Sequence, residues 1–251
     1  MIKFSFHYTL LVITFVGMGC GRSEQGRAVE KKSAPKTSIK LVETSLDSPL
    51  TEGEVTQFLE IVQRLPDQKV PVFNKAALSL SIKEDEDFDV YVESLRHSLR
   101  SAINAEAQGT NWRQERSLAK AFQLVGVSPE DFAKLATKIT LAWSAAAVKG
   151  EVPILLTQRR LTEQLEQAET DYRDQASTPE QHREILNRVQ ELVALSEFLL
   201  IVQNTPEGSL ITIRENQTLL SEVLPKLDLA AQFEKFLINA PEVAQTKYTI
   251  H

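Results

Sequence analysis

The sequence contains few of the residues that metal and redox sites require. Its 251 residues include one cysteine and four histidines. One cysteine cannot form an internal disulfide, and His97, His182 and His251 have no cysteine or second histidine at the spacing of metal ligands. The nucleophile elbow, the phosphate-binding loop and the dinucleotide fingerprint are also missing from the sequence. We therefore expect a protein that is not an enzyme and that uses neither a metal ion nor a cofactor.

The sequence also lacks a run of basic residues. Lys and Arg number 28 against 34 Asp and Glu, which gives a formal net charge of −6. Nucleic acids and anionic lipid surfaces attract proteins mainly through clustered positive charge. This composition therefore argues against a nucleic-acid partner and against binding to anionic lipid by charge.

An acidic cluster at residues 84–89 has only part of the pattern of a calcium-binding loop. Asp85, Asp87 and Asp89 stand at the first, third and fifth positions of such a loop. The sixth position should be glycine and the twelfth glutamate, but the sequence has Val90 and Arg96 there. Acidic side chains stabilise the positive end of a helix, so the cluster predicts a helix that starts near Asp85.

Glycine is scarce, with nine residues, and apolar residues recur at helical spacing through almost the whole chain. This pattern predicts an all-α fold, an irregular multi-helix bundle with a long antiparallel helical hairpin at about 155–203. Thr178, Pro179 and Gln181 are typical of a helix start, and they separate two helices whose apolar residues alternate four and three apart. We expect the wide apolar end of this hairpin, residues 199–202, to be buried and its polar tip to project.

A second pair of helices is predicted between residues 111 and 150. Gly126 is typical of the residue that ends a helix in the left-handed backbone conformation. Ser128 followed by Pro129 is typical of the start of the next helix.

Four large apolar residues of this pair have two interpretations. Trp112, Phe132, Ile139 and Trp143 fall on its apolar faces, which favours packing in a core. The alternative is a groove in which Trp143 is partly exposed beside the other three residues.

The remaining elements are shorter. A helix is predicted from Thr51 to Pro66, an irregular loop at 69–81, and a helix from near Asp85 to about residue 107 that ends at residues 108–110. Residues 210–213 fit the start of a strand. Residues 219–224 are predicted to form a helix that ends at Pro225, and residues 229–237 are predicted to form a last short helix that Asp228 caps.

Residues 1–19 have the organisation of an export signal. Lys3 provides a positive charge, and residues 8–16 form an apolar run too short to span a bilayer as a mature helix. Gly19 and then Cys20 follow shortly after this run. The segment resembles a bacterial lipoprotein signal, which implies that Cys20 is lipidated and becomes the mature N-terminus. Gly17 departs from the aliphatic residue usual in such signals, and an ordinary signal peptide with an unrelated cysteine is the alternative.

These segments divide the chain into a signal peptide (1–19), a lipidated cysteine with a disordered tether (20–49), a single all-helical domain (50–240) and a loose tail (241–251). If the rule of the lipoprotein family holds, Gly21 after the cysteine favours the outer membrane, with the domain facing the periplasm. A lipid anchor would hold the protein at a membrane that it does not span.

Two functions are compatible with a membrane-anchored helical domain that has no catalytic motif. The first is an interaction or assembly module with a protein partner in the cell envelope, and the second is a carrier for a small apolar molecule or lipid. An exposed apolar groove favours the first function, whereas a closed apolar cavity of roughly 300 Å³ or more favours the second. We expect the interaction module.

Overall fold

The computed structural model describes residues 45–73, 87–174, 178–225, 227 and 233. Within these residues the chain forms helices and no strand, which confirms the predicted all-α fold. The helices are α2 (Glu52–Arg64), α3 (Phe88–Ala102), α4 (Ala105–Gln114), α5 (Arg116–Val125), α6 (Pro129–Val148), α7 (Ile154–Asp174), α8 (Pro179–Asn204), α9 (Glu207–Glu215) and α10 (Gln217–Val223), with a 3₁₀ turn at Pro66–Gln68.

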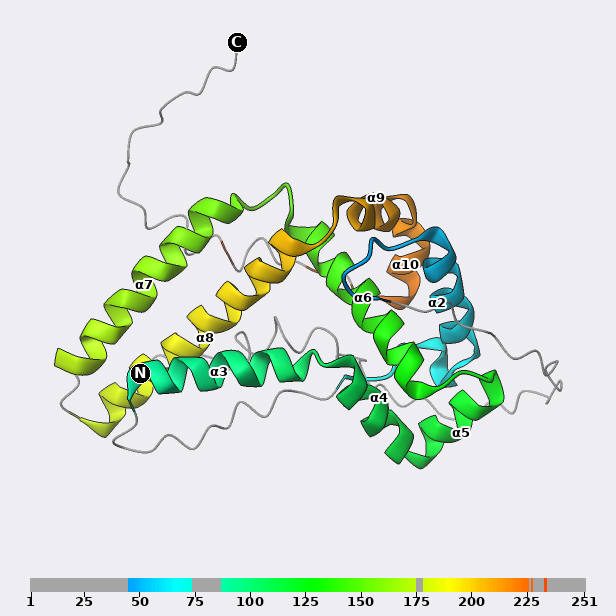
Figure 1. Cartoon of the computed structure of the whole chain (residues 1–251), viewed down its shortest axis with the longest axis horizontal. Coiled ribbons are helices and arrows are strands. Elements are labelled where there is room, and N and C mark those ends of the chain that lie inside the picture. The colour runs from blue at the N-terminus through cyan, green and yellow to red at the C-terminus, as the bar shows by residue number, and fades with distance from the viewer. Residues whose placement is uncertain (1–44, 74–86, 175–177, 226, 228–232, 234–251) are drawn as a thin grey trace, which may run out of the picture.

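Helix α6 crosses the centre of the molecule and separates two groups of helices (Figure 1). On one side α7 and α8 form the predicted antiparallel hairpin, and α3 packs against α8. On the other side α2, α9 and α10 lie together, and α4 crosses α6 near the start of α6. Helix α6 contacts α2, α4, α8 and α9, so it joins the two groups.

The hairpin begins its second helix where the sequence predicts. The Thr178 hydroxyl accepts a hydrogen bond from the Gln181 backbone N–H at 3.2 Å, and the Gln181 side chain accepts one from the Thr178 N–H at 3.1 Å. This reciprocal pair is a capping box, which satisfies two backbone donors at the start of α8. At the wide end of the hairpin Leu199 and Val202 are buried, but Leu200 is 40% exposed.

The described residues of the hairpin tip are mostly exposed, in line with our expectation, but the start of α3 contacts the tip at one side. The ring of Tyr172 near the end of α7 lies 5.6 Å from the ring of Phe88 at the start of α3. Arg173 also approaches the Asp89 carboxylate at 3.8 Å. Helix α3 therefore packs beside the end of the hairpin, because its apolar face needs a partner. The tip remains exposed at Arg173, Asp174 and residues 178–181.

The prediction that residues 108–110 end a helix is wrong. Helix α3 already ends at Ala102, and the Asn104 side chain starts α4 by accepting hydrogen bonds from the backbone N–H groups of Glu106 and Ala107. Helix α4 continues through Gly109. A Cβ atom on Gly109 would lie 2.4 Å from the Cα atom of Glu130 in α6. The glycine is therefore present because the two helix backbones approach closely, and not because the chain turns.

The predicted pair of helices at 111–150 is confirmed at its turn and is different at its start. Gly126 has the left-handed backbone conformation, with φ of 78°, and the Ser128 hydroxyl accepts from the Asp131 N–H at 3.1 Å. The predicted first helix is interrupted at Glu115, however, so that Trp112 lies on α4 and Phe122 lies on α5.

The predicted strand at 210–213 is helix α9. Leu210 and Ile213 are buried three residues apart, and Ile211 between them is 48% exposed. Three apolar residues in four also fit an alternating pattern, so the short segment did not distinguish the two structures. The end of α2 before Pro66 and the helix at 219–224 are confirmed.

Several predicted features lie outside the described residues. They are the signal peptide, Cys20, residues 20–44 of the tether, residues 74–86 with the start of the acidic cluster, most of the last short helix and the tail at 241–251. Residue Asp87, which is described, is the N-cap of α3.

The buried side chains form two clusters. The first, here called the aliphatic core, lies between α3, α7 and α8 and includes Leu95, Leu161, Leu192 and Leu199. The second, here called the aromatic core, is built around Phe58, Trp112, Phe122 and Phe132 from four helices. Helix α6 supplies Ala145 and Val148 to the aliphatic core and its earlier residues to the aromatic core. The two cores are therefore continuous along one helix.

Candidate binding cleft and the buried ion pair beside it

A cleft of about 650 Å³ lies between α3, α6, α8 and residues 45–50, which we call the strap. Its volume is in the range of sites that hold a small molecule or a few side chains of a protein partner. Most of the residues that line it are apolar, and they include Leu46, Leu99, Ile103, Leu141, Ala142, Ala194, Phe198, Leu200 and Ile201. Four charged residues also line it, namely Asp47, Arg100, Lys138 and Glu197.

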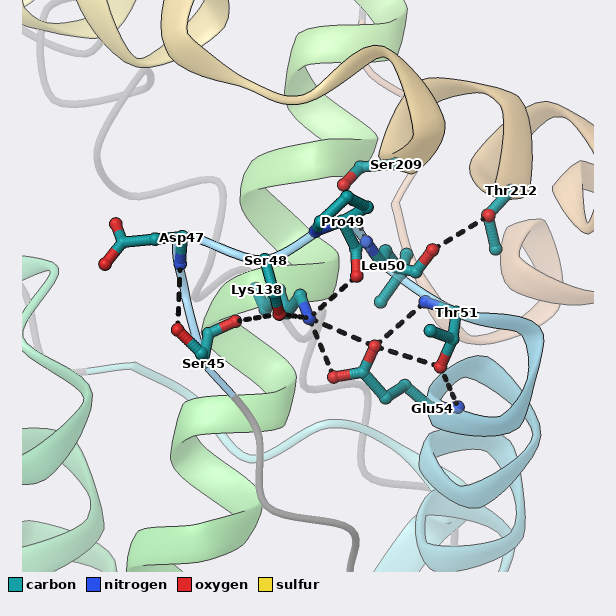
Figure 2. Close-up of polar contacts among 10 residues, drawn as sticks. All are labelled: Ser45, Asp47, Ser48, Pro49, Leu50, Thr51, Glu54, Lys138, Ser209 and Thr212. Carbon is teal, nitrogen blue, oxygen red and sulfur yellow. Dashed lines mark hydrogen bonds and ion pairs between the residues drawn. The ribbon is translucent and has the colours of Figure 1, made fainter.

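The strap is held against α9 by two hydrogen bonds from its last residue. The Leu50 N–H donates to the Ser209 hydroxyl at 2.8 Å, and the Leu50 carbonyl accepts from the Thr212 hydroxyl at 3.0 Å (Figure 2). Leu50 is itself buried in the aromatic core. These contacts place a segment that the sequence assigned to the tether, residues 45–49, directly beside the folded helices.

Lys138 of α6 holds the strap from the other side. Its side chain is 5% exposed. Its ammonium group donates to the Ser48 hydroxyl at 3.0 Å, to the Pro49 carbonyl at 3.2 Å and to both carboxylate oxygens of Glu54 at 2.8 and 3.0 Å (Figure 2). A buried ammonium is costly unless oxygen acceptors replace its water. Here the strap and α2 supply these acceptors.

Glu54 is positioned by the start of its own helix. It is the third residue of α2, and its carboxylate accepts from the Thr51 N–H at 2.8 Å while the Thr51 hydroxyl accepts from the Glu54 N–H at 3.3 Å. This capping box therefore also presents a carboxylate to Lys138 (Figure 2).

A second ion pair crosses the cleft edge between α3 and α8. Arg100 donates from Nε and Nη2 to the two carboxylate oxygens of Glu197 at 2.8 and 3.0 Å. Arg96 approaches the same carboxylate at 3.6 Å. The hydrogen bonds from Arg100 to Glu197, and then the negative charge of Glu197, raise the pKa of Arg100 above its ordinary value. This two-point contact fixes the relative position of α3 and α8.

Three of the four charged residues that line the cleft are thus engaged in ion pairs. Lys138 pairs with Glu54, and Arg100 pairs with Glu197. These charges hold segments of the protein together, and the arrangement of the cleft suits binding of apolar groups between charged edges. Across the described ranges no three His, Cys, Asp or Glu side chains are grouped as a metal site would need.

The predicted groove residues do not line this cleft. Trp112, Phe132 and Ile139 are at most 2% exposed and belong to the aromatic core, as the packing interpretation expects. The indole N–H of Trp112 donates to the Val72 carbonyl at 3.0 Å. Trp143 is partly exposed, and its N–H donates to the Pro225 carbonyl at 3.0 Å. The groove that combines these four side chains is therefore not formed.

The sequence contained a signal for Lys138 that we did not use. Lys138 lies three residues after Leu135 and four before Ala142, both of which are on the buried face of α6. A lysine on the apolar face of a helix requires buried acceptors. The identity of those acceptors was not predictable, because Ser48 and Pro49 are 90 and 89 positions away along the chain.

No protein-family model matches this chain, and no curated protein or solved structure is significantly similar to it. In the part of the chain that the structure describes, none of the helices has both the length and the apolar character to cross a membrane.

Proposed function

We propose that this chain is a lipoprotein of the bacterial cell envelope, anchored by lipid on Cys20, whose helical domain is a non-catalytic interaction or assembly module. In this proposal the cleft binds an apolar segment of a protein partner. The outer membrane, with the domain facing the periplasm, is the favoured location. The observation that carries the proposal is the apolar cleft with exposed leucines at its edge.

Two leucines support a protein partner over an enclosed small molecule. Leu46 and Leu200 line the cleft and remain 45% and 40% exposed. Pockets for small molecules usually bury most of the surface of their ligand. A partner that covers the cleft edge would remove both leucines from water, and a fully buried leucine contributes roughly 1.5–3 kcal/mol.

Photo-crosslinking tests the role of the cleft. A photoreactive amino acid is placed at Leu200 in the full chain, and its control is the same substitution at Leu124, which is 79% exposed on α5 and does not line the cleft. We expect one protein adduct from position 200 in native envelopes, and none from position 124. Equal adducts from both positions, or none from position 200, contradict binding in the cleft.

The membrane anchor has a separate test. We expect Cys20→Ala to move the protein from the membrane fraction to the soluble fraction, because each methylene of an acyl chain contributes about 0.8 kcal/mol of membrane binding. Ser23→Ala is the control, since it changes a neighbouring polar residue and leaves the thiol. A Cys20→Ala protein that stays firmly in membranes would exclude the lipid anchor.

A carrier for a small apolar molecule or lipid is the second candidate, and the cleft volume of about 650 Å³ favours it. Mass spectrometry of protein purified in mild detergent distinguishes the two functions. A bound lipid or metabolite at one equivalent, together with no protein adduct at Leu200, would identify a carrier.

A further inference from the structure

The strap forms part of the cleft wall and is also attached to α6 and α9. Leu46 and Asp47 form part of the cleft wall, whereas Ser48, Pro49 and Leu50 make the contacts to α6 and α9. The same segment follows directly after the chain that leads to Cys20. The position of the cleft wall and the attachment of that chain therefore depend on the same few hydrogen bonds.

The contacts of the strap differ along its length. The Asp47 N–H donates to the Ser45 hydroxyl at 3.4 Å, within the strap itself. The Ser48 hydroxyl donates to the Ser45 carbonyl at 3.0 Å and accepts from Lys138. Among the described residues no hydrogen bond joins residues 45–47 to a helix (Figure 2). Leu46 and Asp47 are thus held in place through Ser48 and Pro49, which Lys138 binds.

The attachment of the strap to α6 therefore depends on the one side chain of Lys138. One ammonium group contacts Ser48, Pro49 and Glu54, and all of these contacts are lost if it moves. The contacts of Leu50 with α9 would remain, because they do not involve Lys138. Loss of the Lys138 contacts would then leave the strap held only through Leu50, so that the whole segment opens more readily and the cleft widens.

We propose that the strap is a releasable wall of the cleft and that Lys138 is the positioning residue that keeps it closed. An occupant that needs a wider cleft must displace Leu46 against the Lys138 contacts, so binding in the cleft and release of the strap are coupled. The coupling rests on the proposed function of the cleft, whereas the release of the strap does not.

Hydrogen exchange on the full chain in mild detergent tests the release without any partner. We expect the backbone amide of Leu50 to exchange at least tenfold faster than the amides at the centre of α8, because the strap opens while the helices stay folded. In Lys138→Met the strap is held through Leu50 alone, so this amide should exchange at least tenfold faster again while the α8 amides stay protected. If the strap and α8 amides exchange at one common rate in both proteins, the strap opens only by global unfolding and the proposal fails.

Two further variants keep this test interpretable. Lys149→Met is the matched control, since Lys149 pairs with Glu207 of α9 at 3.1 Å, and it should leave strap exchange unchanged. Ser209→Ala removes the acceptor of the Leu50 N–H without leaving a buried charge, so it provides a readout if Lys138→Met does not fold. It should speed exchange at Leu50 at least tenfold and leave α8 protected, and an unchanged rate at Leu50 would contradict a strap that opens by itself.

The coupling is measured by the crosslinking yield at Leu200. We expect Lys138→Met to raise the yield of the partner adduct at least threefold, because the wall no longer resists displacement. An unchanged or reduced yield, with a strap that does exchange rapidly, would overturn the coupling alone. Rapid strap exchange with no adduct in either protein would instead contradict the proposed function and leave the releasable strap supported.

Discussion

The aliphatic core and the aromatic core are built in different ways. The aliphatic core consists mainly of leucines, valines and alanines, most of them on α3, α7 and α8, and two of these helices are consecutive in the chain. In the aromatic core the ring of Phe132 lies 5.9 Å from Phe58, 5.9 Å from Trp112 and 5.4 Å from Phe122, and each ring comes from a different helix.

The ion pairs beside the two cores differ in how deeply they are buried. The ion pair of Arg100 with Glu197 is near the aliphatic core and has an arginine side chain that is 62% exposed. The ion pair of Lys138 with Glu54 has 5% exposure on both sides. The core assembled from distant segments thus depends on buried polar contacts, whereas the core built on the hairpin depends mainly on a repeating apolar pattern. The cleft lies where the cores meet, since Phe198 belongs to one and Ala142 to the other.

The largest expected effect is at Phe132. Phe132→Ala should lower the free energy of unfolding by about 4 kcal/mol, because it removes contacts with several rings and leaves a cavity. Leu192→Ala, at a buried position of the aliphatic core, is the matched variant and should cost about 3 kcal/mol. Urea unfolding followed by tryptophan fluorescence and by circular dichroism should give coincident transitions for both variants. Separate transitions would show that α6 does not couple the two cores.

The next effect separates close packing from helix propensity. Gly109→Ala should destabilise the protein by about 2 kcal/mol, because the new methyl group would meet the backbone of Glu130. Gly53→Ala in α2 is the control, since a Cβ there approaches only the Thr51 hydroxyl at 3.9 Å, and it should stabilise by roughly 0.5 kcal/mol. Thermal unfolding measures both, and a stabilising Gly109→Ala would show that α4 and α6 do not cross closely.

The helix starts should each have a smaller effect. Ser128→Ala and Thr178→Ala should each cost about 1 kcal/mol, because a backbone N–H at the start of α6 or α8 loses its acceptor. Chemical denaturation of the two single variants and the double variant measures this. A cost below a few tenths of a kcal/mol at either site would mean that the side chain does not cap its helix.

The smallest effect is a gain in stability. Thr137 is buried on α6, and its hydroxyl is the one buried side-chain oxygen or nitrogen in the described residues that has no hydrogen-bond partner. Thr137→Val keeps the shape and removes the unsatisfied hydroxyl, so it should raise the free energy of unfolding by roughly 0.5–1 kcal/mol. Thr157→Val is the contrast, because the Thr157 hydroxyl donates to the Pro153 carbonyl at 3.0 Å, and it should not stabilise.

The features that the sequence allowed us to predict are local ones. The starts of α6 and α8 and the end of α5 depend on residues within four positions of each other, and the hairpin follows from a short repeating pattern. The errors concern contacts between distant segments. Gly109 resembles a helix end until Glu130 is placed beside it, and the sequence pattern did not predict that Phe88 of α3 packs against Tyr172 of the hairpin.

The candidate site was missed for the same reason. We selected large apolar residues as groove residues, but large apolar residues gain most from complete burial, and three of the four selected residues are in the core. The cleft is instead lined by smaller residues from four segments, and its edge charges become recognisable only when Arg100 meets Glu197 and Lys138 meets Glu54.

The strap has a consequence for the order in which the chain folds during synthesis. Leu50 bonds to Ser209 and Thr212, which follow it by 159 and 162 residues. At translation rates of about 5–20 residues per second, the partners of Leu50 are made roughly ten to thirty seconds after Leu50 itself. The strap is therefore made before all of the described helices but cannot be attached until α9 has been made, so its attachment reports that synthesis has passed α9.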